Sequence, residues 1–348
     1  MNGASENLIE KAEAGHPLSR AEAEAFMEEL LSGRVATPEI VRMLLALNQR
    51  AASVDELVGF ARVMRKHATP VFAAGESRPT GLVDTCGTGG DESGTFNIST
   101  ASAIVAAAAG ARVAKHGNRS VSSRSGSADI LEALGVRIDL PMTVAGCSVR
   151  EIGIGFLFAP TAHAASRHAA PARQQIGKRT IFNLLGPLTN PAGAEAQVLG
   201  VFSADVIDTV AAALAELGTH RAFVVHGAGG LDEISLSGET QIAEVRNGSV
   251  RRFIVAPEDF GVSRAPLEAI RGGTPPENAK LIHSLLAGEP GPRLDIVVAN
   301  AAAALVATGI AEDFRSAAEL ARQAVASGEA QIKLQQLRDF SQKHAPRK

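Results

Sequence analysis

The stretch from residue 81 to residue 127 constrains the fold and chemistry of this chain more than any other part of its sequence. It begins with the apolar pair Leu82-Val83, passes through a turn with glycines at 87, 89 and 90, and continues into an alanine-rich run. This order predicts a strand, a tight turn and a helix over 98–110. Glycine lets a ligand approach the backbone closely, and a helix N-terminus offers free N–H groups and partial positive charge. The combination is typical of a site that binds phosphate.

Polar side chains within the same stretch strengthen this interpretation. Asn97 or Ser99 is expected to cap the helix, because a short polar side chain there accepts the unpaired amides of the first turn. Lys115, Arg119 and Arg124 supply charged donors. A glycine-rich turn alone is more often structural than functional, but the density of donors between 87 and 127 favours a phosphate cradle.

Several familiar nucleotide-binding and catalytic motifs do not fit the chain. Gly87-Thr-Gly89 has Glu92 where the dinucleotide fingerprint needs its third glycine, and Gly227-Ala-Gly229 has Asp232 there. The sequence contains no Walker A run, no nucleophile elbow and no His-Glu-x-x-His. The phosphate group is therefore expected to belong to another kind of ligand.

The composition narrows the class of protein. A length of 348 residues corresponds to roughly two domains. A net charge of −3 argues against binding to nucleic acid, which needs many unbalanced Lys and Arg residues. The longest apolar runs, 98–111 and 294–310, are too short to span a membrane. Two cysteines, Cys86 and Cys147, cannot form a metal cage, and together with a polar N-terminus they indicate a reduced, cytoplasmic protein.

Two domains are predicted from the change in pattern along the chain. Residues 1–72 are expected to form a helical domain with helices near 5–14, 20–32, 38–50 and 54–67, where Ser19 with Glu22 and Ser53 with Glu56 fit capping boxes. Residues 78–161 and 191–348 alternate short β-rich runs with helices, which predicts an α/β domain with a mixed, mostly parallel sheet. The more helical segment 162–190 is expected to fold back onto the helical domain.

The elements of the α/β part are predicted from these runs. Strands are expected at 81–84, 111–114, 155–158, 196–202, 221–225 and 249–255. Helices are expected at 98–110, 127–134, 143–151, 203–217, 276–287, 294–308, 313–326 and 329–343. Asn247-Gly248, between two β-prone runs, predicts a hairpin turn.

Candidate residues for a metal ion and for a carboxylate substrate occur outside the cradle. Asp232 and Glu233 follow a predicted strand on a glycine-rich loop, and adjacent carboxylates suit Mg²⁺, which takes oxygen ligands and bridges substrate phosphates. Such a pair alone is more often a solvated acidic loop, and the nearby cradle shifts the balance toward magnesium. Arg173 and Asn183 stand out in the segment 173–190, and a guanidinium is the natural partner of a carboxylate substrate.

Taken together, these motifs resemble the anthranilate phosphoribosyltransferase family. The resemblance rests on Gly87 to Asp91, Asn97 to Thr100, Lys115 to Arg119 with Ser122-Ser123, Arg179 to Pro191, and Asp232-Glu233, and it extends over about residues 5–343. It implies a small helical domain joined to a large α/β domain of the nucleoside phosphorylase type, and a homodimer formed through the helical domain. It also implies transfer of the phosphoribosyl group of phosphoribosyl pyrophosphate (PRPP) to the amine of anthranilate, with Mg²⁺.

The resemblance assigns roles to residues that match the family motifs. PRPP contacts fall on Gly87, Gly90, Asp91, Thr95, Asn97, Ile98, Ser99, Thr100, Lys115, His116, Gly117, Asn118, Arg119, Ser120, Val121, Ser122, Ser123 and Ser127. Anthranilate contacts fall on Gly87, Asn118 and Arg173, and metal contacts fall on Ser99, Asp232 and Glu233. No nucleophile or general base is expected, because an aromatic amine is already neutral at physiological pH.

Two departures from the family pattern and two alternatives accompany this prediction. The family commonly reads His-Pro-Ala-Met where this chain has His163-Ala-Ala-Ser166, and Ser120 replaces a usual alanine. The first departure touches the aromatic-substrate channel. The alternatives are a nucleoside phosphorylase-like enzyme, which would not need the Asp232-Glu233 pair, and a non-catalytic nucleic-acid-binding paralogue, which would favour a basic groove.

Overall fold

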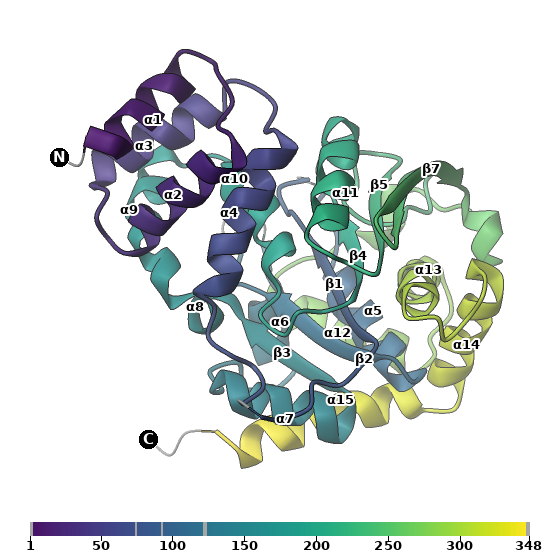
Figure 1. Cartoon of the computed structure of the whole chain (residues 1–348). Coiled ribbons are helices and arrows are strands. Elements are labelled where there is room, and N and C mark those ends of the chain that lie inside the picture. Colours follow the sequence, from purple (N-terminus) through teal and green to yellow (C-terminus); the bar gives the residue numbers. More distant parts are fainter. Residues whose placement is uncertain (1–2, 74, 92, 121–123, 346–348) are drawn as a thin grey trace.

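The N-terminal part of the chain is a group of four helices (Figure 1). The computed structural model describes residues 3–73, 75–91, 93–120 and 124–345. The four helices are α1 (Gly3–Glu13), α2 (Arg20–Leu31), α3 (Thr37–Leu47) and α4 (Val54–Lys66). The capping boxes predicted at Ser19 with Glu22 and at Ser53 with Glu56 are both present. These four helices match the predicted ones to within about one turn.

A seven-stranded sheet forms the centre of the remaining chain. Its strands are β1 (Leu82–Gly87), β2 (Arg112–Gly117), β3 (Ile154–Phe158), β4 (Ala196–Gly200), β5 (Arg221–Gly227), β6 (Thr240–Arg246) and β7 (Ser249–Val255). The spatial order is β3-β2-β1-β4-β5-β6-β7, with parallel pairing from β3 to β5 and antiparallel pairing beyond it. The predicted mixed, mostly parallel sheet is confirmed. Asn247 and Gly248 both take positive φ in the predicted hairpin between β6 and β7.

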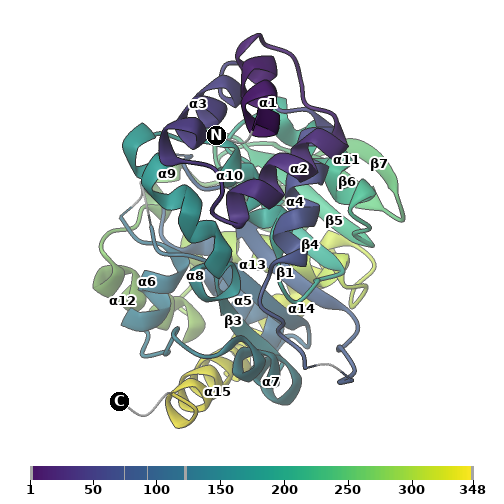
Figure 2. The same cartoon turned by 60° about the vertical axis from the view of Figure 1, so that its left-hand side comes forward.

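Helices cover both faces of this sheet (Figure 2). The helices of the α/β part are α5 (Ile98–Ala108), α6 (Ser127–Ala133), α7 (Met142–Ile152), α11 (Ile207–Glu216), α12 (Pro275–Leu286), α13 (Pro292–Ala307), α14 (Phe314–Ala326) and α15 (Glu329–Lys343). Short 3-10 helices lie at Ala204–Val206, Pro257–Phe260 and Leu267–Ile270. The core of α5, α13, α14 and α15 takes Val83 and Val113 from one sheet face, whereas Leu82 and Ala114 face α7. This alternation follows from the two-residue period of a strand.

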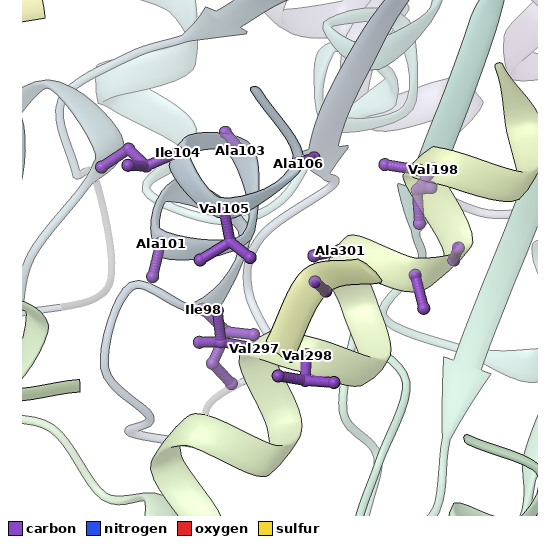
Figure 3. Packing of buried hydrophobic residues seen from close by; sticks show 14 of the residues in the cluster. Ile98, Ala101, Ala103, Ile104, Val105, Ala106, Val198, Val297, Val298 and Ala301 are labelled. Atoms are coloured by element: carbon purple, nitrogen blue, oxygen red, sulfur yellow. The ribbon is translucent and has the colours of Figure 1, made fainter. Parts of the chain in front are cut away.

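Small side chains let α5 and α13 pack closely (Figure 3). Ala101, Val105, Val297 and Ala301 lie within their shared core, where each is less than 1% exposed. The chain contains no Trp or Tyr, so this core is built from alanine and aliphatic side chains with a few phenylalanines. The close packing holds the N-terminus of α5 in place beside the end of β1, which is where the site lies.

The segment after β3 returns to the N-terminal helices. It contains α8 (Ala159–Ala162), a 3-10 helix (Ala164–Ala169), α9 (Ala170–Ile176), α10 (Ile181–Leu185) and a second 3-10 helix (Pro187–Thr189). Apolar residues of α2, α3, α4, α10 and α11 share one core, so the helical part and this face of the sheet are continuous. We call residues 159–191 the return segment. Among the described residues, no helix combines the length and apolar character needed to cross a membrane.

Candidate active site

The glycine-rich turn, residues 87–91, lies at the carboxyl end of the central strand β1. From β1 the chain first builds β2 and β3 on one side and then β4 and β5 on the other. Such a switch in strand order opens a crevice at the carboxyl ends of the strands, where α/β proteins bind ligands. Gly89 and Gly90 take positive φ values of 64° and 77°, which explains the need for glycine at both positions.

A carboxylate from the loop after β5 lies directly against this turn. The amide of Gly89 donates a hydrogen bond to Asp232 Oδ2 at 3.0 Å. A Cβ atom at Gly87 would lie 2.5 Å from the same oxygen, so the absence of a side chain there makes room for the carboxylate. A glycine-rich turn of a kind that suits phosphate and an acidic side chain that suits a cation therefore adjoin one another.

The environment of Asp232 and Glu233 disfavours the charged form of both carboxyl groups. Burial, followed by the negative charge of Asp91 and a hydrogen bond with it, raises the pKa of Asp232 to about 8. Burial and the charge of Asp232 raise the pKa of Glu233 well above its usual value, although nearby Lys115 opposes the shift. A group of like charges held together in a protein stores unfavourable energy that a bound cation relieves.

Asp232 and Glu233 suit a Mg²⁺ ion that is bound jointly by the protein and by substrate phosphates. Among the described residues, no group of three or more His, Cys, Asp or Glu side chains has the arrangement of a closed metal cage. Mg²⁺ does not require one, because it commonly binds one or two carboxylates and completes its shell with substrate phosphates and water. Within the described part of the chain, Asp91 Oδ2 is also buried without an N–H donor or a hydroxyl group to bind it.

Lys115 connects the carboxylates to the start of α5. Its Nζ atom donates to Thr85 O and, at 3.3 Å, to Ser99 Oγ. The amide of Ser99 in turn donates to the Glu233 carboxyl group. Burial lowers the pKa of Lys115, and the negative charges of Asp84 and Glu233 act in the opposite direction. The structure therefore brings Ser99, Lys115 and Glu233 into one contact group beside Asp232.

The predicted side-chain cap of α5 is wrong. Asn97 stands at the capping position, but its side chain makes no capping hydrogen bond. Its amide group donates to Ser125 O at 2.9 Å and its oxygen accepts from Asn278 at 3.1 Å, so these partners hold it away from the helix. The Ser99 amide consequently stays available for the Glu233 carboxylate.

The second wall of the cradle is formed by the segment after β2. Ser127 Oγ donates to Asn118 O at 3.2 Å, and a Cβ atom at Gly117 would lie 2.1 Å from Ser127 Oγ. Arg119 turns outward, because its guanidinium group pairs with Asp129 and Glu132. Gly126 and Ser120 donate their amides to Asp129, which orders this wall.

The remaining predicted PRPP residues are unevenly placed. Thr95 forms an isolated bridge with Arg271, and its hydroxyl group lies 3.3 Å from Ser93 Oγ. Ile98 and Thr100 are buried against the core, so their side chains do not line an open surface. Arg124, predicted only as a charged donor of the cradle, lies near Glu277 and helps to lower the pKa of that carboxyl group. The predicted contacts at Val121, Ser122 and Ser123 lie outside the described residues.

Two buried histidines, His116 on β2 and His163 after α8, lie next to each other. The rings of His116 and His163 lie 5.1 Å apart, and among the described residues the Nε2 atoms of both lack hydrogen-bond partners. Burial lowers the pKa of His116 to about 3, helped by the charges of His163 and Lys115. Burial likewise lowers the pKa of His163 to about 4. His116, predicted as a PRPP contact, is thus a buried residue, and His168 lies over Gly33 of the helical part.

The lowered pKa values of His116 and His163 predict that the folded protein loses stability at acidic pH. A histidine with a depressed native pKa takes up its proton only on unfolding between pH 6.5 and its native pKa, so stability falls as the pH drops through that interval. His163→Gln removes one such group. We expect the stability advantage of the unmodified chain over this variant to shrink by about 1.4 kcal/mol per pH unit between pH 6 and pH 4.5.

Urea unfolding at several pH values measures this difference. His283→Gln, the same substitution at an exposed histidine, is the matched control. A pH dependence of His163→Gln that matches the unmodified chain would contradict this prediction, because it would show that His163 takes up its proton as readily in the folded as in the unfolded protein.

Arg173 lies on α9 in the return segment, away from the carboxylates. Its guanidinium group stands 5.2 Å from the centre of the Phe182 ring, and burial lowers its pKa. Within the described ranges no ion pair forms at Arg173, unlike the outward-facing Arg119. A partly buried, unpaired guanidinium group is suited to a planar carboxylate ligand.

The comparisons with known proteins agree with this geometry. Residues 79–331 match the glycosyl transferase family α/β domain, and residues 6–68 match the helical bundle domain of the same family. An anthranilate phosphoribosyltransferase from Pelotomaculum thermopropionicum is 52% identical over 335 residues, which cover 96% of each chain. The chain belongs to the anthranilate phosphoribosyltransferase family. Its two-part α/β architecture, predicted from the resemblance, is that of the family.

Solved structures of anthranilate phosphoribosyltransferases have the same fold. The enzyme from Thermus thermophilus is 46% identical, with a TM-score of 0.90 over 96% of this chain and 99% of that one. The Saccharomyces cerevisiae enzyme, solved in complex with PRPP and Mg, is 25% identical, with a TM-score of 0.88 over 99% of each chain.

Two buried residues beneath the turn are absent from the predicted set. Asp84 on β1 accepts hydrogen bonds from the His116 amide at 3.1 Å and from Asn190 Nδ2 at 2.8 Å. Asn190 also donates to Ala114 O, so it ties the return segment to both β1 and β2. A polar residue within an otherwise apolar strand run, as Asp84 is, was the available sequence signal.

Proposed function

We propose that this chain transfers the phosphoribosyl group of PRPP to the amine of anthranilate, giving N-(5-phosphoribosyl)anthranilate and pyrophosphate in tryptophan biosynthesis. The observation that carries the proposal is the contact between the Gly89 amide and Asp232. This contact supports the proposal because it joins the glycine-rich turn, the proposed phosphate site, to Asp232, the proposed cation ligand, as a magnesium-bound pyrophosphate requires. Membership of the anthranilate phosphoribosyltransferase family supports the choice of acceptor.

The donor side is assigned to the glycine-rich turn, the start of α5 and the wall after β2. The Thr88 amide donates to Gly200 O and the Gly89 amide to Asp232. We therefore assign the stabilisation of negative charge on the leaving pyrophosphate to the amides of Gly90 and Asp91 and to the Lys115 ammonium group. Ser99, Asp232 and Glu233 would hold Mg²⁺, which neutralises charge on the pyrophosphate when bound. Asn118 and Ser127, which contact each other, are proposed as further donor contacts after β2.

The reaction is a displacement at the anomeric carbon of ribose. The bond from that carbon to the pyrophosphate oxygen breaks, the bond to the anthranilate nitrogen forms with inversion, and the nitrogen then loses a proton. The acceptor amine is neutral before attack, so the chain needs no strong general base. Its contribution is orientation of the two substrates and fixed electrostatic stabilisation.

Arg173 is proposed as the partner of the anthranilate carboxylate. Arg173→Ala removes a charged donor from a partly buried position, and such hydrogen bonds contribute about 1.5–3 kcal/mol. We therefore expect the KM for anthranilate to rise about 10- to 100-fold while the KM for PRPP stays unchanged. Steady-state kinetics with each substrate varied in turn measures both values, and Gln174→Ala on the exposed side of α9 is the matched control. An effect confined to PRPP would refute this placement.

The assembly and the location of the protein are proposed on the family pattern. We propose a cytoplasmic homodimer formed through the helical part, where α3 leaves Leu45 45% exposed. Analytical ultracentrifugation measures the association state. A monomer at micromolar concentration would contradict the homodimer.

A turnover assay tests the proposed function. Purified protein with Mg²⁺, anthranilate and PRPP is expected to deplete anthranilate fluorescence and to release one pyrophosphate per anthranilate consumed. Omission of PRPP or chelation of Mg²⁺ should stop both signals. Well-folded protein that leaves anthranilate untouched, or that instead cleaves nucleosides with inorganic phosphate, would defeat the assignment.

A further inference from the structure

Two side chains of the return segment hold the carbonyl groups of the glycine-rich turn. Arg179 Nη1 donates to Gly90 O at 2.7 Å, and Asn183 Nδ2 donates to Thr88 O at 3.3 Å. These two carbonyl groups flank Gly89, whose amide donates to Asp232. The turn is therefore held at three successive residues by side chains from two other segments.

Because the peptide bond is planar, these contacts to carbonyl groups also fix the direction of the neighbouring N–H groups. The carbonyl of one residue and the N–H of the next share a rigid plane and point in opposite directions. A fixed Thr88 carbonyl thus sets the direction of the Gly89 amide, which faces Asp232. A fixed Gly90 carbonyl sets the direction of the Asp91 amide in the same way. Without these bonds, two glycines with positive φ would leave the turn free to rotate its peptide planes.

Arg179 lies flat along the turn. Its Cζ atom is 4.4 Å from the centre of the Phe202 ring, and a Cβ atom at Gly90 would be 2.9 Å from its Cδ atom. Phe202 is itself fixed to the turn, because its amide donates to Thr88 Oγ1 at 3.1 Å. A planar guanidinium group can stack on an aromatic ring and donate hydrogen bonds at the same time, whereas the ammonium group of lysine cannot stack in this way.

The same residue joins the turn to the helical part of the protein. Asn48, at the end of α3, donates its side-chain amide to Arg179 O at 2.8 Å. The neighbouring helix α10 shares its apolar core with α3 and α4. A movement of the helical part therefore acts on the backbone of Arg179 and, through its side chain, on Gly90.

We propose that Arg179 is a positioning residue for the donor substrate: it orients the glycine-rich turn toward the pyrophosphate and links that turn to the helical part through Asn48. Asn183 assists at Thr88. The inference rests on the proposed function, since it takes a magnesium-bound pyrophosphate as the ligand of the turn. It assigns to Arg179 no contact with the reacting atoms.

Equilibrium binding of PRPP in the presence of Mg²⁺, measured by calorimetry without anthranilate, tests the proposal. Arg179→Ala is expected to weaken donor binding about 10- to 100-fold, because a charge-assisted hydrogen bond is lost and the turn is released. The KM for anthranilate stays within twofold of the unmodified value. Added guanidinium ion at millimolar concentration restores part of the donor affinity, and Arg179→Lys keeps the charge without restoring it.

Two further variants separate positioning from general damage. Lys178→Gln, the exposed neighbour, leaves donor affinity unchanged. Asn48→Ala removes only the bond to the Arg179 carbonyl and gives a smaller loss of donor affinity, which adds little in the Arg179→Ala background.

The inference is overturned by unchanged donor affinity in Arg179→Ala, or by an equal loss of donor and acceptor affinity that guanidinium does not rescue. Unchanged affinity in Asn48→Ala overturns the link to the helical part. If Arg179→Ala does not fold, Arg179→Lys and Asn48→Ala decide the question. An unmodified chain without turnover defeats the proposed function, whereas normal turnover with a silent Arg179→Ala defeats this inference alone.

Discussion

Asp232→Asn combined with Glu233→Gln is expected to lower kcat/KM for PRPP by at least about a thousandfold, since cation-assisted charge stabilisation contributes several kcal/mol to such reactions. Both carboxylates lie on the loop after β5, and that of Asp232 accepts a hydrogen bond from the Gly89 amide. Steady-state kinetics over a range of Mg²⁺ concentrations measures the loss. The substitutions preserve shape, so the effect reports charge and not packing.

The same variant should be at least as stable as the unmodified chain when Mg²⁺ is absent. Burial and mutual repulsion raise the pKa values of Asp232 and Glu233, so removal of both charges relieves strain in the folded state. Thermal unfolding in chelator measures this. Glu239→Gln, an exposed acid on the same loop, is the control and should change neither property. If the double variant retained its activity at limiting Mg²⁺, Asp232 and Glu233 would not be metal ligands.

Gly87→Ala is expected to lower turnover about a hundredfold or more without unfolding the protein. The added Cβ would lie 2.5 Å from Asp232 Oδ2, so the carboxylate must move by roughly 1 Å, a displacement that can cost on the order of 10²-fold in rate. The φ of Gly87 is not positive, and alanine therefore brings no backbone strain of its own. Kinetics and Mg²⁺ titration on the variant measure the loss.

Gly186→Ala is the matched control for this prediction. A Cβ atom at Gly186 would meet only Phe182 O at 3.5 Å, an ordinary contact, and its φ of −49° suits alanine. This control should keep full activity and stability. If Gly87→Ala also keeps full activity, Asp232 does not need its present position against the turn.

Local sequence pattern was sufficient to predict most helices and strands. The differences at strand ends come from pairing between neighbouring strands of the sheet. The helices of the N-terminal part begin at capping boxes, which are visible in the sequence. The strands β1 and β2 continue three residues beyond their predicted ends, because Gly87 pairs with Gly200 and Gly117 pairs with Phe158. Glycine has low strand propensity, so only the neighbouring strands show that the sheet extends into the turn. The run 240–246 was predicted only as one arm of a hairpin and forms the full strand β6.

The predicted site depends on motifs near in sequence, and its unpredicted features join segments far apart. Asp232 reaches the turn across 143 positions of the chain, and Asn190 reaches Asp84 across 106. Asn97 and Arg119 have residue types that suit a cap and a phosphate contact, yet each is held by partners that sequence alone does not reveal. Conformational competition among polar partners, which depends on the fold, decides such cases.

Anomalous diffraction of Mn²⁺ in crystals grown with PRPP locates the cation with respect to the glycine-rich turn. We expect a manganese peak within bonding distance of Asp232 and Glu233, with pyrophosphate oxygens between that peak and the amides of Gly90 and Asp91. A well-ordered PRPP molecule whose cation lies away from both carboxylates would contradict this expectation.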